Sequence, residues 1–364
     1  MSFWSNLFGK KEKNAPVPAK PKTRTDFEST FSVNDAEQTG RLNAAFVKTR
    51  SPRAEETKQL KDVLDIIESV PDGKKLLADV ATAGYKINFD TFRGASTGTC
   101  NPVEKQIMLC PANHSSEAAI AASLYHEMTH AMQNERSGGM LADSSQYNIA
   151  DQVKLLRAAE ASAWMEEAKF AHQIKDEHPE VLQHVGNAPM YKAFAAEMEK
   201  SGDTAKACES AFKDWYGFKI YQAGYENQHI AIVKNKTLNR LKKQDAKAFR
   251  KSLSSEDALK FTVISDSVKI APEFLTSPAA FSVSDNGAKA FAAISKGYSA
   301  KFLSAVKDNS VQSMYSYDTG KRLADGRGAE KTEGASLMSS LTTISKQQTA
   351  KKQAIASAVQ NKTR

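Results

Sequence analysis

The sequence lacks the cysteine content of a disulfide-rich or cysteine-metal protein. Its 364 residues include 3 cysteines, Cys100, Cys110 and Cys208. Their spacing fits no metal cluster, and their odd number argues against an oxidised scaffold. We therefore expect reduced thiols. One alternative stays open, because Cys100 and Cys110 flank a turn near residues 101–105 and can face each other across a hairpin; a bridge there would indicate an oxidising compartment.

The sequence also lacks a long apolar run and a secretion signal. No apolar stretch approaches the roughly 20 residues that cross a bilayer, so no transmembrane segment is expected. The first apolar residues precede the first lysines, the reverse of a signal peptide, so we expect a cytoplasmic protein, with non-classical export left open. The residues Phe3, Trp4, Leu7 and Phe8 are compatible with a short membrane-surface anchor or with a disordered or docking tail.

Positive charge is not gathered in one block. The 50 Lys and Arg residues exceed the 42 Asp and Glu residues by a net charge of +8, but acids are interspersed throughout. No nucleic-acid motif accompanies the basic residues, so solvated helix faces explain them and no nucleic-acid partner is expected. A chain with 41% hydrophobic and 25% charged residues has the composition of a globular protein with one large or two modest domains.

The most informative pattern that is present is the HExxH motif at residues 126–130. The preceding residues 116–125 contain neither Gly nor Pro and offer Ser116 as an N-cap, which predicts a continuous helix. On a helix, His126 and His130 lie one turn apart on one face and can reach a single ion, while Glu127 lies close enough to take a proton from water. The motif predicts a zinc hydrolase with one zinc per chain. The alternative is a pair of structural histidines on a core helix.

A catalytic zinc site needs a third protein ligand, and Glu160 is the favoured candidate. The route through a third histidine six residues after His130 is closed, because Arg136 stands there. Glu160 lies in a second helix-like segment, residues 153–164, whose small residues would let it approach the first helix closely. Arg157, one turn earlier, would orient Glu160 or form a plain ion pair with it on a solvated face.

Other acids compete with Glu160 for the third ligand position. They are Asp143, Asp151, Glu166 and Glu167. Glu166 and Glu167 are expected to point elsewhere around the helix, and we favour Glu160 over all four competitors.

Hydrolysis also needs a hydrogen-bond donor for the developing oxyanion. An aromatic-rich segment, residues 215–229, offers candidate donors in Tyr216, Tyr221, Tyr225 and His229. We favour Tyr225 as a catalytic residue, against the alternative that these side chains only fill the core.

An HExxH motif followed by a glutamate on a second helix resembles the gluzincin arrangement of zinc metallopeptidases. Four segments in order, YKINF (85–89), CNPVEKQIMLCP (100–111), LYHEMTHAMQ (124–133) and RAAEA (157–161), resemble a bacterial "putative metallopeptidase" domain family over roughly residues 55–235. The resemblance implies zinc ligands at His126, His130 and Glu160, a general base at Glu127 and a peptide or protein substrate. It also implies that residues 106–110 form the sheet edge that pairs with substrate, although an internal strand there stays open.

The expected fold class is α+β and mostly helical, a zincin-like metallopeptidase domain with a small sheet. A helix broken near residues 71–73 and strands at residues 85–92 and 106–109 precede the motif. We expect a flexible N-terminal segment and linker (1–26), the zincin-like domain (27–235), a helical extension (236–325) and a flexible tail (326–364). The sequence does not indicate an oligomeric state.

Two functions compete at this point. The first is a zinc-dependent peptidase; the second is a catalytically inactive zincin-fold protein that binds partners or serves in assembly. Glu127 favours the enzyme, because a purely structural zinc site uses a fourth protein ligand and has no need of a base.

Overall fold

The fold of this chain was taken from a computed structural model that describes residues 23–36, 47–90, 97–141, 143–242, 251–302 and 308–324. The expected α+β class is confirmed, since helices predominate around one small mixed sheet. The apolar residues at the extreme N-terminus and the expected C-terminal tail lie outside the described residues. Among the described helices, none is long and apolar enough to cross a membrane.

The main sheet has five strands in the order β2-β1-β3-β5-β4. They are β1 (Ser32–Ala36), β2 (Val47–Arg50), β3 (Lys86–Asp90), β4 (Gly98–Asn101) and β5 (Gln106–Leu109). The three inner strands are parallel to one another, while β2 and β4 run antiparallel at the two edges. The expected strands are therefore present, but the expectation that residues 106–110 form the edge is wrong. β5 is internal, because the short strand β4 pairs along its far side.

The register of the β4–β5 hairpin settles the open question about the cysteines. Cys100 lies opposite Ile107, and Cys110 follows the end of β5, where its amide donates to the carbonyl of Thr97. Cys100 and Cys110 are therefore three register positions apart, and no disulfide links them or Cys208.

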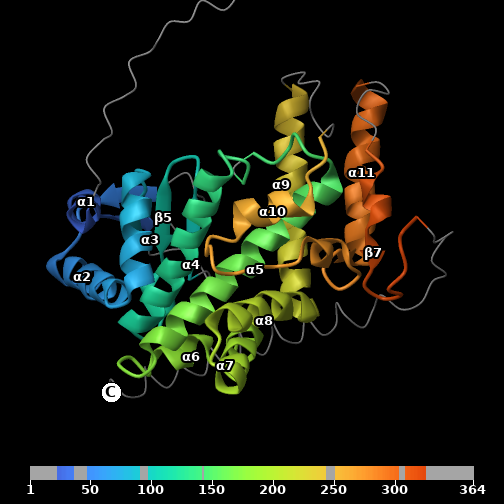
Figure 1. Cartoon of the computed structure of the whole chain (residues 1–364). Coiled ribbons are helices and arrows are strands. Elements are labelled where there is room, and N and C mark those ends of the chain that lie inside the picture. The colour runs from blue at the N-terminus through green and yellow to red at the C-terminus, as the bar shows by residue number, and fades with distance from the viewer. Residues whose placement is uncertain are drawn as a thin grey trace, which may run out of the picture. The chain divides into compact units, whose positions relative to one another are not determined.

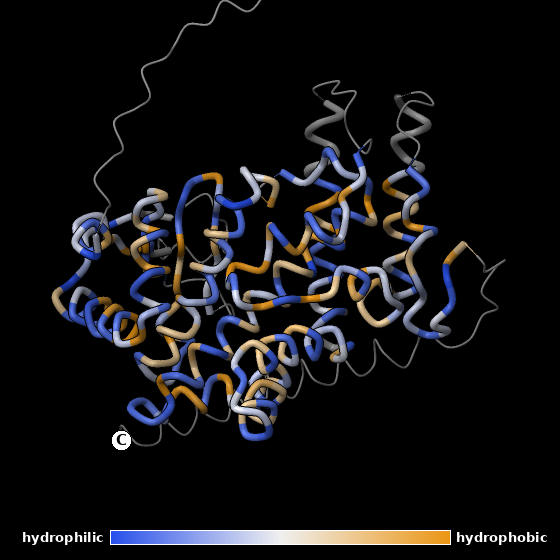
Figure 2. The backbone as a smooth tube through the Cα atoms, viewed as in Figure 1, coloured by the Kyte–Doolittle hydropathy of each residue, from blue (hydrophilic) through white to orange (hydrophobic). Residues whose placement is uncertain are grey.

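The helices before the site pack against one another, and the first of them contacts the sheet at β3. After the short α1 (Arg24–Thr30) come α2 (Ala54–Glu68) and α3 (Pro71–Thr82), which break where Pro71 occupies the first turn of α3. Figure 2 shows hydrophilic and hydrophobic residues alternating along these helices, as expected for elements with one buried face. Their buried residues include Leu60, Leu64 and Leu77.

Two long helices cross the middle of the molecule, with the sheet and α3 on one side and the C-terminal helices on the other (Figure 1). They are α4 (Glu117–Arg136) and α5 (Ile149–Ile174). Each begins at a capping side chain: Ser116 accepts from the amide of Ala119 at 3.2 Å, and Asn148 accepts from that of Asp151 at 2.8 Å. Both helices are almost wholly buried, so polar side chains on them are held in fixed surroundings.

The remaining elements pack around α5. They are α6 (Val181–Val185), α7 (Pro189–Ser201), α8 (Thr204–Gly217), α9 (Lys219–Lys242), α10 (Ser255–Thr262), α11 (Asp285–Phe302), the two-stranded sheet β6 (Ser282–Val283) and β7 (Tyr315–Ser316), and short 3₁₀ turns. The expected domain boundary at residue 235 falls inside α9, and α10 contacts both α4 and α5. A second apolar core joins the start of α5 to α9 and α11 through Val153, Val233 and Phe291.

Candidate metal site

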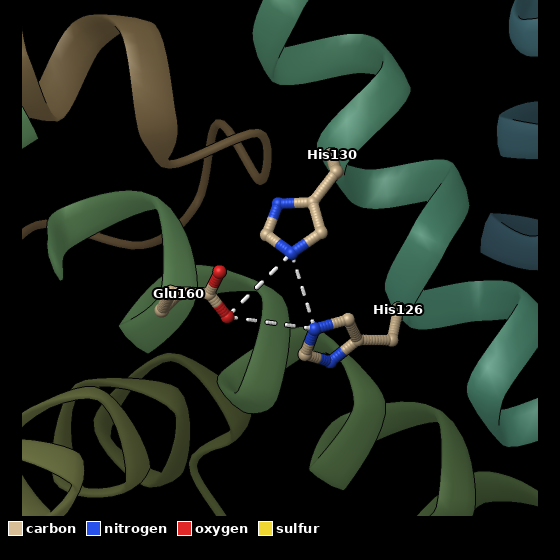
Figure 3. A group of neighbouring side chains, drawn as sticks. All are labelled: His126, His130 and Glu160. Carbon is tan, nitrogen blue, oxygen red and sulfur yellow. Dashed lines mark hydrogen bonds and ion pairs between the residues drawn. The ribbon is translucent and has the colours of Figure 1, made fainter. Parts of the chain in front are cut away.

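Three predicted ligands meet in the structure. His126 and His130 project from α4 and Glu160 projects from α5, and the three side chains point toward one another (Figure 3). The two Nε2 atoms are 3.1 Å apart. Glu160 Oε2 lies 3.8 Å from Nε2 of His126 and 3.6 Å from Nε2 of His130.

These separations fit a single metal ion. Ligand atoms about 2.0–2.1 Å from a tetrahedral zinc ion lie roughly 3.3 Å from one another, and the three separations in the structure, from 3.1 to 3.8 Å, span that value. Two imidazoles and one carboxylate form a donor set that zinc accepts, and three protein ligands leave a coordination position for water or substrate.

Small residues bring the two helices together at this point. Ala159, Ala161 and Ala163 are all buried on α5. Ala159 and Ala163, four residues apart, lie on one side of the helix near Glu160, whereas Ala161 lies toward the opposite side. Gln133 of α4 donates through Nε2 to the carbonyl oxygen of Ala159 at 3.0 Å, which ties the helices together one residue before Glu160. The close approach expected from the sequence is therefore present.

Both imidazoles are oriented by an acceptor on their other nitrogen. Nδ1 of His130 lies 2.9 Å from Oε1 of Gln133, and Nδ1 of His126 lies 3.0 Å from Oε2 of Glu167. The Gln133 amide nitrogen donates to two backbone carbonyls, so its oxygen is the atom that accepts from His130. Nδ1–H donation on both rings leaves each Nε2 lone pair for the ion.

Glu167 is a site residue that the sequence reasoning missed. Its Oε1 lies 3.1 Å from Nε2 of His184, which in turn lies 3.2 Å from the Ser123 hydroxyl. Ser123 continues the network to His114, 2.8 Å away. The expectation that Glu167 points elsewhere is wrong, because residues seven apart on a helix come back to nearly the same face.

The other competing acids lie away from the ligand atoms. Asp143 accepts from Ser145, Asp151 pairs with Lys154 at 2.6 Å, and Glu166 pairs with Lys169 at 2.7 Å. Among the described residues, only the group of His126, His130 and Glu160 has metal-ligand spacing.

Arg157 serves neither of the roles expected for it. It is 1% exposed, so it lies on no solvated face. Its guanidinium donates to the carbonyl of Ser282 and, at 2.7 Å, to the hydroxyl of Tyr317, and it lies 3.5 Å from the carboxylate of Glu226. Arg157 therefore fastens the C-terminal segment and α9 to α5.

Glu127 lies beside the ligands and is buried, and burial raises the pKa of its carboxyl. It packs against β4: a Cβ atom at Gly98 would lie 2.9 Å from Cγ of Glu127. Glycine at this position is what lets the edge strand approach the carboxylate so closely.

The charges of the site compensate one another. Burial acts to lower the pKa of His126, but its contacts with the carboxylates of Glu160 and Glu167 outweigh burial and raise that pKa to about 10. The pKa of His130 is also raised, against burial, by Glu160. Burial acts to raise the carboxyl pKa values, yet the two histidines hold that of Glu160 well below its usual range, and His126 and His184 lower that of Glu167 to about 2.

The site opens into a cavity of about 760 Å³ that α4, α5, α9 and β4 line. Tyr225 lines it and accepts a hydrogen bond from Nε1 of Trp164 at 3.2 Å, beside Glu160. Tyr216, Tyr221 and His229 are not among the lining residues; Tyr216 and His229 are buried, and Tyr221 packs edge-on against Trp164. Of the four candidate donors, Tyr225 is the one that lines this cavity.

We expect Glu167→Gln to weaken zinc affinity by about 10- to 100-fold, because the neutral amide is a weaker acceptor for Nδ1–H of His126. Competition with a chelating dye measures this affinity. The matched control is Glu166→Gln, one residue away, which should leave affinity near that of the wild type because Glu166 faces Lys169. Equal zinc affinities in the two variants would show that the hydrogen bond from His126 to Glu167 does not contribute to zinc binding.

Comparison with known protein families places this chain in one of them. A family described as "Putative metallopeptidase family" matches residues 36–276, from the last residue of β1 through the helices that carry the site to the 3₁₀ turn Pro272–Thr276. Searches of curated proteins and of solved structures gave no match. The matched region is longer than the resemblance noted from the sequence and takes in α10.

Proposed function

Because the chain belongs to this putative metallopeptidase family, we propose that it is a zinc-dependent peptidase that hydrolyses peptide bonds. The observation that carries the proposal is the convergence of His126, His130 and Glu160, with Glu127 held beside them in one cavity. A base next to an open metal site is the arrangement that hydrolysis needs.

His126, His130 and Glu160 are the residues that would hold the ion. Zinc, when bound, polarises a carbonyl and makes water more acidic. The hydrogen bonds from Glu167 and Gln133 keep the two imidazoles in the orientation that binding requires. Buried helices on both sides fix these positions before substrate arrives.

Glu127 is the proposed general base. Its carboxylate takes a proton from the attacking water and later delivers it to the leaving amine. Burial raises its pKa, which makes the protonated form easier to hold between these two steps. Tyr225 is the proposed donor to the developing oxyanion, because its hydroxyl lies beside Glu160 at the cavity wall.

The strand β4 is the proposed docking edge for an extended substrate. Among the described strands it is the last of the sheet on this side, and Thr97, Gly98, Thr99 and Cys100 line the cavity. An extended peptide can bind a sheet by adding a strand alongside its outermost strand. The close contact of Gly98 with Glu127 would then place the peptide backbone next to the base.

We expect zinc binding to release protons at neutral pH. In the metal-free protein the raised pKa of His126, about 10, keeps its ring protonated at pH 7, and binding requires the neutral ring. Affinity should therefore rise with pH, about tenfold per unit for each proton released, until the pKa is passed. Zinc calorimetry in two buffers of different ionisation enthalpy counts these protons. If the heat of zinc binding is the same in both buffers, no proton is released, and the ring of His126 is not protonated in the metal-free protein.

The same pKa shift has a consequence for the metal-free fold. A raised histidine pKa stabilises the folded state fully below the unfolded value near 6.5 and ceases to do so as pH rises through about 10. The apoprotein should therefore lose stability as pH rises between these two values. Its affinity for zinc should rise over the same range.

The test of the proposed function is cleavage of a diverse peptide mixture, read by mass spectrometry. Zinc-loaded protein should produce new peptide termini, and protein treated with a chelator should not. Cleavage at the same rate in the chelated protein would refute a zinc-dependent mechanism.

A further inference from the structure

The cavity has two chemically different ends on either side of the proposed ligands. α4 and α5 run in opposite directions past each other: Ser123 of α4 connects through His184 to Glu167 of α5, whereas Gln133 of α4 bonds to Ala159 of α5. The level of Ser123 on α4 therefore matches that of Glu167 on α5, and the level of Gln133 matches that of Ala159. The ligands lie between these two levels.

One end is polar. Ser123, Glu167 and His184 line the cavity there and are linked to one another by hydrogen bonds. A substrate group at this end meets a hydroxyl, an imidazole and a carboxylate.

The opposite end is apolar. Leu156 lies one turn before Glu160 on α5, and Leu141 follows the C-terminus of α4; both line the cavity. Ile232 of α9 joins them, because its neighbour Val233 packs with Val153 in the second core and so holds this part of α9 beside the first half of α5.

The tip of the β4–β5 hairpin completes the apolar end. Val103 is 78% exposed, the most exposed large hydrophobic side chain among the described residues, and it lines the cavity together with Pro102. Lys105 in the same turn pairs with Glu135 near the end of α4 at 3.1 Å, which places the tip at the Leu141 end. Val103 and Pro102 thus extend the apolar lining formed by Leu141, Leu156 and Ile232, and an apolar stretch of cavity wall is suited to an apolar group of a ligand.

We propose that the site selects peptides with a bulky apolar side chain close to the cleaved bond, bound among Val103, Leu141, Leu156 and Ile232. This inference rests on the proposed peptidase function and adds its substrate class. Burial of a leucine-sized side chain there, in place of alanine, should raise kcat/KM by about ten- to a hundred-fold. An acidic side chain at this position should be rejected, since it would lose water without gaining a partner while Glu127 and Glu160 lie nearby.

The experiment uses one peptide mixture in two ways. Wild-type protein with zinc is assayed for cleavage, and zinc-loaded Glu127→Gln, which lacks the base, is assayed for retention of uncut peptides. Cleavage and retention should both favour large apolar residues at one position over Asp and Glu. Cleavage without this preference would overturn the inference and leave the peptidase function standing. If the variant retains apolar peptides but the wild type cleaves none, the apolar end of the cavity binds such side chains and the proposed peptidase function is refuted. If the wild type cleaves no peptide and the Glu127→Gln variant retains none, both the inference and the peptidase function are overturned.

Variants at Val103 test the specificity directly. Because Val103 is exposed, Val103→Asp should fold normally. It should lower cleavage next to apolar residues by roughly tenfold and raise cleavage next to Lys and Arg, because the new carboxylate offers them a partner. Val103→Leu is the matched control and should keep the apolar preference. A cleavage profile in Val103→Asp that is the same as in the wild type would overturn the assignment.

Discussion

Replacing Glu127 with glutamine is expected to lower the rate of peptide hydrolysis by about 10²- to 10⁴-fold, the usual contribution of a general acid–base residue. Glutamine has nearly the same shape as glutamate but cannot accept the proton of the attacking water. Glu127 does not belong to the ligand group found among the described residues, so the variant should keep its zinc. Activity and metal binding should therefore separate. The measurement is cleavage of a peptide that the wild type cuts, together with metal content of the same samples.

The fold of the Glu127→Gln variant needs an independent check, because Glu127 is buried. A neutral amide should be easy to accommodate, since burial already disfavours the charged carboxylate. We expect the thermal unfolding temperature to stay close to that of the wild type or to rise. A variant that folds, binds zinc and still cleaves at the wild-type rate would show that Glu127 is not the base.

The second large effect is expected from Glu160→Gln, which removes the only carboxylate within the group of candidate ligands. An amide oxygen is a much poorer ligand for zinc than a carboxylate. The loss of zinc affinity should exceed the roughly hundredfold that removal of an outer hydrogen-bond partner costs. His130→Ala should go further and abolish stoichiometric binding, because only two ligands would remain.

Three carboxylate-to-amide variants on α5 should differ in zinc affinity in a fixed order. Zinc affinity should fall steeply in Glu160→Gln, moderately in Glu167→Gln and hardly at all in Glu166→Gln. All three positions lie on α5, and all three changes replace a carboxylate by an amide. A general loss of helix stability would therefore affect them without this order. Wild-type affinity in Glu160→Gln would move the third ligand to another residue.

The parts of the site that depend on local periodicity could be predicted from the sequence. The HExxH spacing placed two imidazoles on one face of a helix, and Ser116 indicated where that helix begins. The small residues around Glu160 indicated a close helix pair, which the structure contains. The role of Glu167 was also within reach, since seven residues make about two turns of helix.

Features that depend on distant partners could not be predicted in this way. Arg157 bonds to a carbonyl 125 residues further along the chain, and no local pattern shows that contact. The edge position of β4 depends on which strands pair, and its sequence, with Gly98 and Asn101 at its ends, is typical of a turn. The apolar end of the cavity likewise combines a hairpin tip, two helices and the residue Leu141, which are brought together only by the fold.

The most direct test of the central claim is zinc dependence of cleavage measured on one sample of the whole chain. The protein is stripped with a chelator, dialysed and titrated with zinc while cleavage of a peptide mixture and bound metal are both followed. We predict no cleavage in the stripped protein and full activity at about one zinc per chain, the stoichiometry of a single three-ligand site. A protein that takes up one zinc and leaves every peptide intact would contradict the peptidase and favour a zincin-fold binding protein.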